Sequence, residues 1–192
     1  MSNIYCAGPL FNKPERDEME LIALHLEQYG HSVFLPHRDG FEFANLRSLL
    51  LDNKLDERTI DVAVSRAIFS LDLYKLVVET DVTVANLNGR VPDEGTVVEA
   101  ALAWHARKVV ILYKKDERSL LNGSDNPMLM GLGNFRTISD IGALSPAIEE
   151  ELSRDKKHDI ENLLALGAEL STAGTPNKSV KRITQILLNR LL

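Results

Sequence analysis

Asp81-Val-Thr-Val-Ala-Asn-Leu87 is an apolar, β-branched run, and this pattern predicts a buried strand. Pro92, Asp93 and Gly95 then turn the chain into an Ala-rich helix that carries Glu99 about one and a half turns inside it. In open α/β sheets ligands bind beyond the carboxyl ends of the strands, and the positive end of a helix dipole stabilises nearby acidic side chains. The sequence therefore predicts carboxylates at a ligand-binding edge.

A capping aspartate followed by a solvated helical face is the simpler interpretation of this helix. Its alanines and Trp104, however, make the segment largely apolar. Burying a carboxylate in such surroundings is costly unless the group has a purpose. We therefore interpret Glu99 as a functional residue.

Strand and helix patterns alternate on both sides of this unit. The patterns predict strands over residues 4–7, 32–36, 82–87, 108–113 and 135–138, and helices over 13–29, 62–79 and 94–106. Residues 37–43 have the composition of a loop, and the polar stretch that follows to Asp61 is expected to be helical in part. This alternation predicts a flavodoxin- or Rossmann-like open parallel sheet of about five strands with helices on both faces.

The chain is expected to divide into two parts. Residues 1–145 would form the α/β domain, and residues 146–192 a C-terminal helical extension. Apolar residues recur at helical spacing over 179–192, so this last helix needs a surface to cover. That surface belongs either to its own domain or to a neighbouring subunit.

The composition restricts the partners of the protein. A formal net charge of −6 argues against a nucleic-acid footprint and favours a small molecule. The chain passes from Met1 directly into an apolar strand with no leader-like segment, and no apolar run approaches the length of about 18 residues that a membrane span needs. Cys6 is the single cysteine and is expected to be a small core residue. We expect a cytoplasmic protein.

Four places in the chain point toward the same edge of the expected sheet. They are Tyr5 with Gly8-Pro9, Asp72, the segment 93–96, and Glu99. Paired carboxylates suit chemistry at a glycosidic bond, because one can attack the anomeric carbon while an acid protonates the leaving group.

Other catalytic classes find little support. The five histidines lack the paired spacing of a metal site, and there is no Gly-x-Ser-x-Gly elbow for a serine nucleophile. Neither Gly-x-Gly-x-x-Gly nor a Walker-type loop occurs, so the usual phosphate cradles of dinucleotides and nucleoside triphosphates are missing. We expect no metal and no cofactor.

At these residues the chain resembles the nucleoside 2-deoxyribosyltransferase family. The resemblance rests on Ile4-Tyr-Cys-Ala-Gly-Pro9, the strand after Asp81, Pro92-Asp-Glu-Gly-Thr96 with Glu99, and Asn126-Pro-Met-Leu129. It covers roughly residues 3–140, and its strongest part is Asp93-x-Gly-Thr-x-x-Glu99.

The resemblance implies a role for each of these residues. Glu99 would be the nucleophile that takes the deoxyribosyl group, and Tyr5 would hold its carboxylate by a hydrogen bond. Asp72 and Asp93 would handle the base and the sugar, and one of them would supply the proton to the leaving base. The resemblance implies deoxynucleosides and free nucleobases as substrates.

Further residues are expected to bind the substrate. Gly95 would keep the backbone thin beside the sugar, and the hydroxyl of Thr96, one turn before Glu99, would orient the carboxylate. Gly8, Pro9 and Phe41 complete the expected contacts of the protein's own subunit.

The resemblance also implies a homo-oligomer that shares its active sites. In the family an Asn and a Met from a neighbouring subunit complete the pocket, and Asn126 and Met128 are the matching positions here. These residues are expected on a turn after the fourth strand.

Other functions stay open on the sequence. The first is an N-glycosidase on the same fold that hands the sugar of a deoxynucleoside, or of its 5-monophosphate, to water, with Lys13, Arg16, Arg38 or Ser124 as phosphate partners. A phosphoribohydrolase of the lysine-decarboxylase-like type is less well supported, because carboxylates stand where its glycine loop would cradle a phosphate. A third possibility is a nucleotide-sensing module without turnover.

Overall fold

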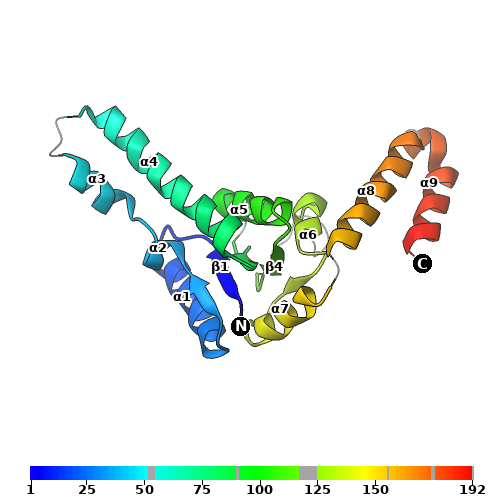
Figure 1. Ribbon diagram of the computed structural model, residues 1–192. Coiled ribbons are helices and arrows are strands. Elements are labelled where there is room, and N and C mark those ends of the chain that lie inside the picture. Colours follow the sequence, from blue (N-terminus) through cyan, green and yellow to red (C-terminus); the bar gives the residue numbers. More distant parts are fainter. Residues whose placement is uncertain (52–54, 90, 117–124, 155, 174–175, 192) are drawn as a thin grey trace. The chain divides into compact units, whose positions relative to one another are not determined.

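The computed structural model describes residues 1–51, 55–89, 91–116, 125–154, 156–173 and 176–191. The chain forms two compact units, Met1–Leu152 and Ser153–Leu192. The first unit is built around a five-stranded parallel sheet, which is drawn with its helices in Figure 1. The expected α/β fold class is therefore confirmed.

All strands of the sheet run parallel, in the order β2-β1-β3-β4-β5. Their bounds are β1 Asn3–Ala7, β2 Ser32–Phe34, β3 Val82–Asn86, β4 Val109–Tyr113 and β5 Thr137–Ile138. This is the strand order of flavodoxin-like folds, in which the chain leaves neighbouring strands β1 and β3 in opposite directions. The crevice beyond the carboxyl ends of these two strands is the ligand site that the topology favours.

Eleven helical segments accompany these strands in the described residues. In the first unit they are α1 Lys13–Gln28, α2 Pro36–Asp39, α3 Phe43–Leu51, α4 Glu57–Tyr74, the π-helix η1 Lys75–Glu79, α5 Glu94–His105, α6 Pro127–Leu132, the 3₁₀-helix η2 Ile141–Ala143 and α7 Leu144–Leu152. In the second unit they are α8 Lys156–Thr172 and α9 Pro176–Leu191.

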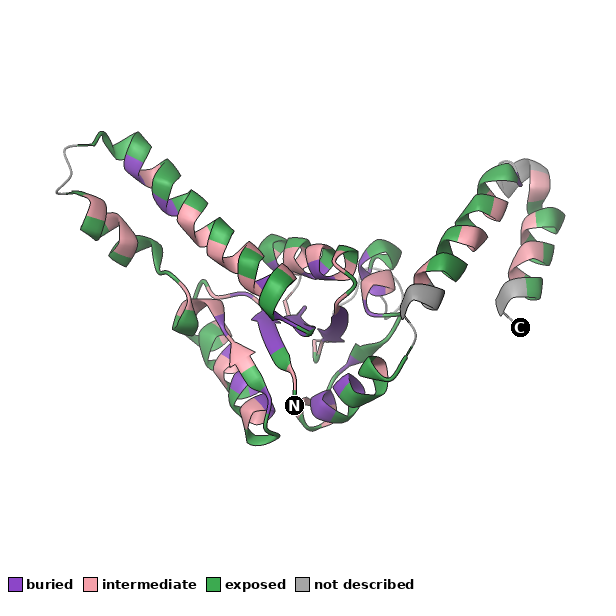
Figure 2. Ribbon diagram, in the orientation of Figure 1, coloured by how far each residue is buried: buried purple, intermediate pink, exposed green. Residues whose placement is uncertain are grey.

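The sheet has an apolar core on each face, and β1 contributes to both. Ile4 and Cys6 pack with α1 and α7 on one face, whereas Tyr5 and Ala7 pack with η1, α5 and α6 on the other. Alternate residues of a strand point to opposite faces, so the period of two places Tyr5 under α5. Figure 2 shows the buried residues concentrated in the strands and on the inner sides of these helices.

Two expected elements differ in the structure. The helix expected over 62–79 begins at Glu57, because the Asp56 side chain accepts the amide of Thr59 at 3.0 Å and caps it. Its last five residues wind as η1, whose end is closed by the Thr80 hydroxyl donating to the carbonyl of Lys75 at 2.7 Å. Such π-turns are common near functional sites.

The segment 37–43 is not all loop. Pro36 begins α2, a single helical turn, and the carboxylate of Asp39 accepts the amide of Leu35 at 2.8 Å. Phe43 already belongs to α3, which packs against α4 as a helical hairpin. A four-residue helix has too few positions to show a period, which is why the sequence pattern indicated a loop.

Candidate active site

The centre of the site is a hydrogen bond between two residues that lie far apart in the sequence. Tyr5 is fully buried in β1, and its hydroxyl donates to Oε1 of Glu99 on α5 at 2.6 Å. Short O–H···O bonds to a carboxylate are strong, and this one fixes the direction of the Glu99 side chain. The expected pairing of Tyr5 with Glu99 is thus present in the geometry.

Burial gives Glu99 an unusual protonation equilibrium. Loss of hydration raises the pKa of Glu99 to about 7; the hydrogen bond from Tyr5 opposes this rise, and the negative charges of Asp72 and Asp93 add to it. Burial, followed by the charges of Glu99 and Asp72, raises the pKa of Tyr5 far above its ordinary value. Tyr5 therefore acts as a hydrogen-bond donor and keeps its proton.

Asp72 is a second carboxyl group with a perturbed equilibrium. It lies half-buried near the end of α4, and burial raises its pKa to about 6. Its Oδ1 atom is shielded from solvent and has no hydrogen-bond partner among the described residues. A carboxyl group of this kind can keep a proton near neutral pH and give it to a substrate.

Asp93 occupies a different environment. Its Oδ2 atom accepts the amide of Thr96 at 2.8 Å and the hydroxyl of Thr96 at 2.9 Å, so Asp93 is the N-cap of α5. The expected contact of the Thr96 hydroxyl with Glu99 is therefore wrong. Thr96 is fully buried and fixes Asp93 instead.

The loop that leads to Asp93 is anchored from two sides. The Oδ1 atom of Asn88 accepts the amides of Lys115 and Asp116 at 2.7 and 2.9 Å, which ties the loop to the segment after β4. The side-chain amides of Asn86 and Asn88 both donate to the carboxylate of Glu18 on α1, at 2.9 and 2.8 Å. These bonds hold the entry to α5 against its neighbours.

A cavity of about 560 Å³ opens beside these carboxylates, a size typical of small-molecule sites. Six expected site residues line it: Gly8, Phe41, Asp72, Asp93, Gly95 and Glu99. Gly8 allows close packing there, because a Cβ atom on it would lie 2.2 Å from the sulfur of buried Met19. Pro9 is buried next to Gly8 but does not line the cavity.

The sequence interpretation missed most of the opposite wall of this cavity. Its further lining residues are Leu10, Phe11, Arg16, Pro36, His37, Glu42, Phe43, Ala44 and Ile68. One signal was available in the sequence: Asn12 caps α1, and a glutamate follows three residues later. The amide of Glu15 donates to Asn12 at 3.0 Å, and the amide of Phe11 donates to Glu15 at 2.9 Å, an arrangement similar to a capping box. This motif places the start of α1, and hence Arg16, just beyond β1.

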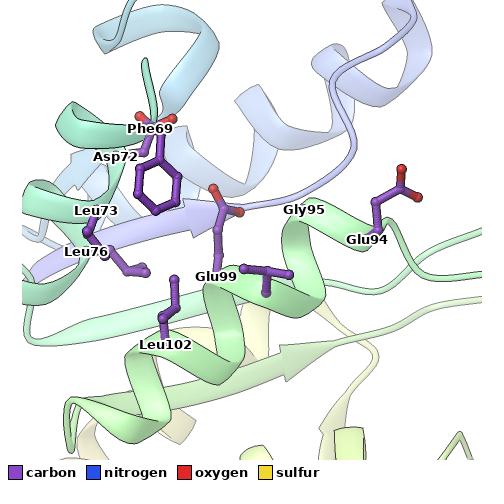
Figure 3. A pocket seen from close by; sticks show the side chains of 9 residues that line it. Phe69, Asp72, Leu73, Leu76, Glu94, Gly95, Glu99 and Leu102 are labelled. Atoms are coloured by element: carbon purple, nitrogen blue, oxygen red, sulfur yellow. The ribbon is translucent and has the colours of Figure 1, made fainter. Parts of the chain in front are cut away.

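A second cavity, of about 290 Å³, shares Asp72, Gly95 and Glu99 with the first. Figure 3 shows Glu99 on α5 with Asp72 and Phe69 across from it. The remaining lining residues are mainly apolar: Leu73, Leu76, Glu94, Gly95, Val98 and Leu102. Phe69 and Val98 are more than half exposed, so this groove presents an apolar surface next to the reactive groups.

Asn126 and Met128 do not line either of these cavities. They belong to the start of α6 rather than to a turn: the Oδ1 atom of Asn126 accepts the amide of Met128 at 2.9 Å and caps the helix. The Met128 side chain is 82% exposed. In this chain the two residues therefore lie outside the cavities of their own Glu99.

No group of three or more His, Cys, Asp or Glu side chains is arranged to hold a metal ion in the described part of the chain. Each helix within that part is too short or too polar to cross a bilayer.

Several solved structures are similar to this chain. A conserved protein from Enterococcus faecalis superposes with a TM-score of 0.60 at 20% identity, over 78% of this chain and 98% of that chain. A 2-deoxyribosyltransferase from Bacillus psychrosaccharolyticus gives a TM-score of 0.49 at 19% identity, over 74% and 90% of the two chains. A CMP N-glycosidase from Clostridium botulinum gives 0.44 at 16% identity, over 79% and 99%.

Comparison with curated protein sequences gave no significant match. The sequence model of the family described as nucleoside 2-deoxyribosyltransferase, in contrast, matches residues 4–169, which is most of the chain. The chain therefore belongs to the nucleoside 2-deoxyribosyltransferase family.

Proposed function

We propose that the protein transfers the 2-deoxyribosyl group of a deoxynucleoside to a second nucleobase through a covalent ester on Glu99. One observation carries this proposal: in a member of this family, the Tyr5 phenol holds the Glu99 carboxylate at 2.6 Å beside a cavity of about 560 Å³ that Asp72 also lines. A fixed carboxylate and a buried acid are the two groups that such a transfer requires.

In the first step the ionised Glu99 attacks the anomeric carbon as the bond to the base breaks. The bonding electrons leave with the base, and the proton of Asp72 moves to the departing ring nitrogen. In the second step a nitrogen of the incoming base attacks the anomeric carbon, the ester bond breaks, and the proton of that base returns to Asp72. Two inversions give retention at the anomeric carbon.

The roles of the other residues follow from their contacts. Asp93 already accepts two hydrogen bonds from Thr96, so it suits the binding of a sugar hydroxyl better than the delivery of a proton. Gly8 and Gly95 contribute to the wall of the cavity, and Phe41 offers a flat apolar surface for the base. No metal or cofactor has a part in this sequence of steps.

An exchange assay tests the proposal. The protein is incubated with deoxyadenosine and free hypoxanthine, and the products are separated by chromatography. New deoxyinosine is the expected result. Free deoxyribose alone would identify a hydrolase, and binding without any product would identify a sensor.

The sugar specificity is a further expected outcome. Deoxyadenosine should react at least about tenfold faster than adenosine, because a 2-hydroxyl withdraws electrons from the developing cation and would need a partner near Tyr5 and Glu99, which already bond to each other. The measurement is kcat/KM for both nucleosides under identical conditions. Equal values would contradict the placement of the sugar over Glu99.

We also propose that the protein is a homo-oligomer whose subunits share active sites. The apolar groove next to Glu99 leaves Phe69 and Val98 exposed, and Met128 projects from α6 without lining its own subunit's cavities. A second copy would cover the groove and supply Asn126 and Met128 to it.

Mixing two inactive variants tests this arrangement. Glu99→Ala removes the nucleophile, and Met128→Ala is the better second variant because Asn126 also caps α6 and its loss would cost stability. If pockets are shared within dimers, random exchange of subunits makes half of the dimers mixed, each with one intact site, and activity should return to about a quarter of the wild-type value. A mixture no more active than its components, or a monomer in light scattering, would contradict the proposal.

A further inference from the structure

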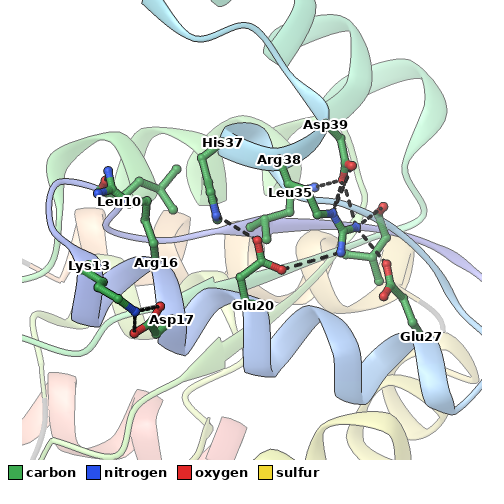
Figure 4. A network of polar contacts seen from close by, with 11 residues as sticks. Leu10, Lys13, Arg16, Asp17, Glu20, Glu27, Leu35, His37, Arg38 and Asp39 are labelled. Carbon is green, nitrogen blue, oxygen red and sulfur yellow. Dashed lines mark hydrogen bonds and ion pairs between the residues drawn. The ribbon is translucent and has the colours of Figure 1, made fainter.

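The sequence offers three cationic side chains as anion-binding candidates: Lys13, Arg16 and Arg38. Two of them form ion pairs with carboxylates. Lys13 pairs with Asp17 at 2.6 Å, and Arg38 contacts Glu27 at 2.8 Å and Asp39 at 3.0 Å, as Figure 4 shows. Neither Lys13 nor Arg38 lines the cavity. Ser124, the remaining sequence candidate for anion binding, lies outside the described residues.

Arg16 differs from both of them. It lines the cavity, and its contact with the described residues is to a neutral group, since Nη1 donates to the carbonyl of Leu10 at 3.2 Å. A guanidinium group has five N–H donors, so this bond orients the side chain and leaves donors available for a ligand. Among the described residues that line the cavity, Arg16 thus supplies a positive charge that no carboxylate neutralises.

The residues that line the cavity come from two regions of the chain with different chemistry. Asp72, Asp93 and Glu99 come from α4 and α5, whereas Arg16 and Phe11 come from the segment that follows β1. In the proposed reaction Glu99 attacks the anomeric carbon from the face opposite the base, so the base extends away from α5. In this arrangement the base points toward the other lining residues, among which are Arg16 and the aromatic rings of Phe11 and Phe41.

A phosphate fits beside Arg16 less well than a base does. Glu42 also lines the cavity, and its carboxylate accepts a bond from Asn45 at 3.1 Å, so four carboxyl groups line the cavity together with Arg16. A dianion would meet more negative than positive charge there. A neutral carbonyl oxygen accepts hydrogen bonds from a guanidinium group without this repulsion.

We propose that Arg16 is a specificity-determining residue that donates to a carbonyl oxygen of the nucleobase, so that the protein prefers oxo-bases such as hypoxanthine and uracil to amino-bases such as adenine and cytosine. The inference rests on the proposed function of the same site. It adds the class of base and names the residue that recognises it.

The test compares deoxyinosine with deoxyadenosine, which differ at the exocyclic position that carries an oxygen or an amino group. The ratio of their kcat/KM values is measured for the wild type, Arg16→Met, Arg16→Lys and the matched control Lys13→Met from the same helix. The ratio should favour deoxyinosine in the wild type and fall roughly 10- to 100-fold in Arg16→Met, the loss expected for a hydrogen bond to a charged group. Arg16→Lys should recover part of the ratio, and Lys13→Met should keep it.

Two results would overturn the proposal. One is an unchanged ratio in Arg16→Met. The other is a loss confined to 5-monophosphates, seen when deoxyadenosine is compared with its 5-monophosphate, which would assign Arg16 to a phosphate instead.

Failure of the proposed function would look different. A hydrolase would still give the ratio of kcat/KM values, now for release of the free base. If the wild type turned over no nucleoside, calorimetric binding of free hypoxanthine and free adenine to the same four proteins would replace the rates. A preference for hypoxanthine that Arg16→Met abolishes would support the role of Arg16, and equal affinities in all four proteins would refute it.

Discussion

Replacing Glu99 with glutamine is expected to lower kcat by at least about 10³-fold, because the amide cannot form the covalent ester on which the proposed reaction depends. Glutamine keeps the size of the side chain, and its Oε1 atom can still accept the bond that the Tyr5 hydroxyl donates at 2.6 Å in the wild type. The measurement is steady-state exchange between a deoxynucleoside and a second base. Glu79→Gln, which alters an exposed carboxylate paired with Lys75, is the control and should stay near the wild-type rate.

The same substitution should make the fold more stable at alkaline pH. Burial raises the pKa of Glu99 from an ordinary 4.5 to about 7, so between these values the folded state binds more protons than the unfolded state. The free energy of unfolding therefore falls as pH rises through this range. The glutamine variant cannot ionise at this position, so its free energy of unfolding does not fall for this reason. A melting temperature that is higher than that of the wild type at pH 8, together with lost turnover, would separate a catalytic defect from a folding defect.

A wild-type rate in Glu99→Gln would contradict the assignment of Glu99 as the nucleophile.

Asp72→Asn is expected to lower the rate with ordinary deoxynucleosides by roughly 10²- to 10⁴-fold, the usual contribution of a general acid. Its effect should depend on the leaving group. A 7-methylguanine base carries a positive charge in the nucleoside and leaves as a neutral molecule, so it needs no proton. The loss with 7-methyl-2-deoxyguanosine should therefore be much smaller, and an equal loss with both substrates would contradict the role of Asp72 as the acid.

The pH profile should report the same pair of groups. Asp72 must be protonated, and with a pKa of about 6 its acid form is lost as pH rises. Glu99 must be ionised, and with a pKa of about 7 its reactive form is lost as pH falls. The two interact, so their apparent values belong to the pair, and kcat/KM should follow a bell-shaped curve with its maximum between about pH 6 and 7. In Asp72→Asn the alkaline limb should disappear.

The sequence was most informative where the signal is local. β-branched runs predicted β1, β3 and β4, and the turn after β3 predicted α5, because burial on both faces of a parallel sheet leaves a continuous apolar pattern. The capped start of α4 and the π-turn after Tyr74 escaped prediction. The start of α4 was missed because the apolar periodicity that indicates a helix begins several residues after the capping residue Asp56. The π-turn was missed because such turns have no simple sequence pattern.

The site was predictable to a smaller extent. The pairing of Tyr5 with Glu99 joins residues 94 positions apart, and only the family resemblance indicated it. Arg16 and His37 reach the cavity because α1 and α2 follow strands that end at the same edge, a placement that depends on the strand order rather than on any spacing in the sequence. The buried state of Asp72 likewise arises from the packing of α4 and η1 beside α5, which the sequence pattern of α4 alone does not reveal.

Trapping the covalent intermediate tests the central claim most directly. The protein is mixed with a deoxynucleoside in the absence of an acceptor base, quenched with acid, digested and analysed by mass spectrometry. The account predicts that the peptide containing Glu99 gains the mass of one deoxyribosyl group, that excess acceptor base removes this modification, and that Glu99→Gln never acquires it. Turnover without any modified peptide, or a deoxyribosyl group on a different carboxylate, would contradict the account.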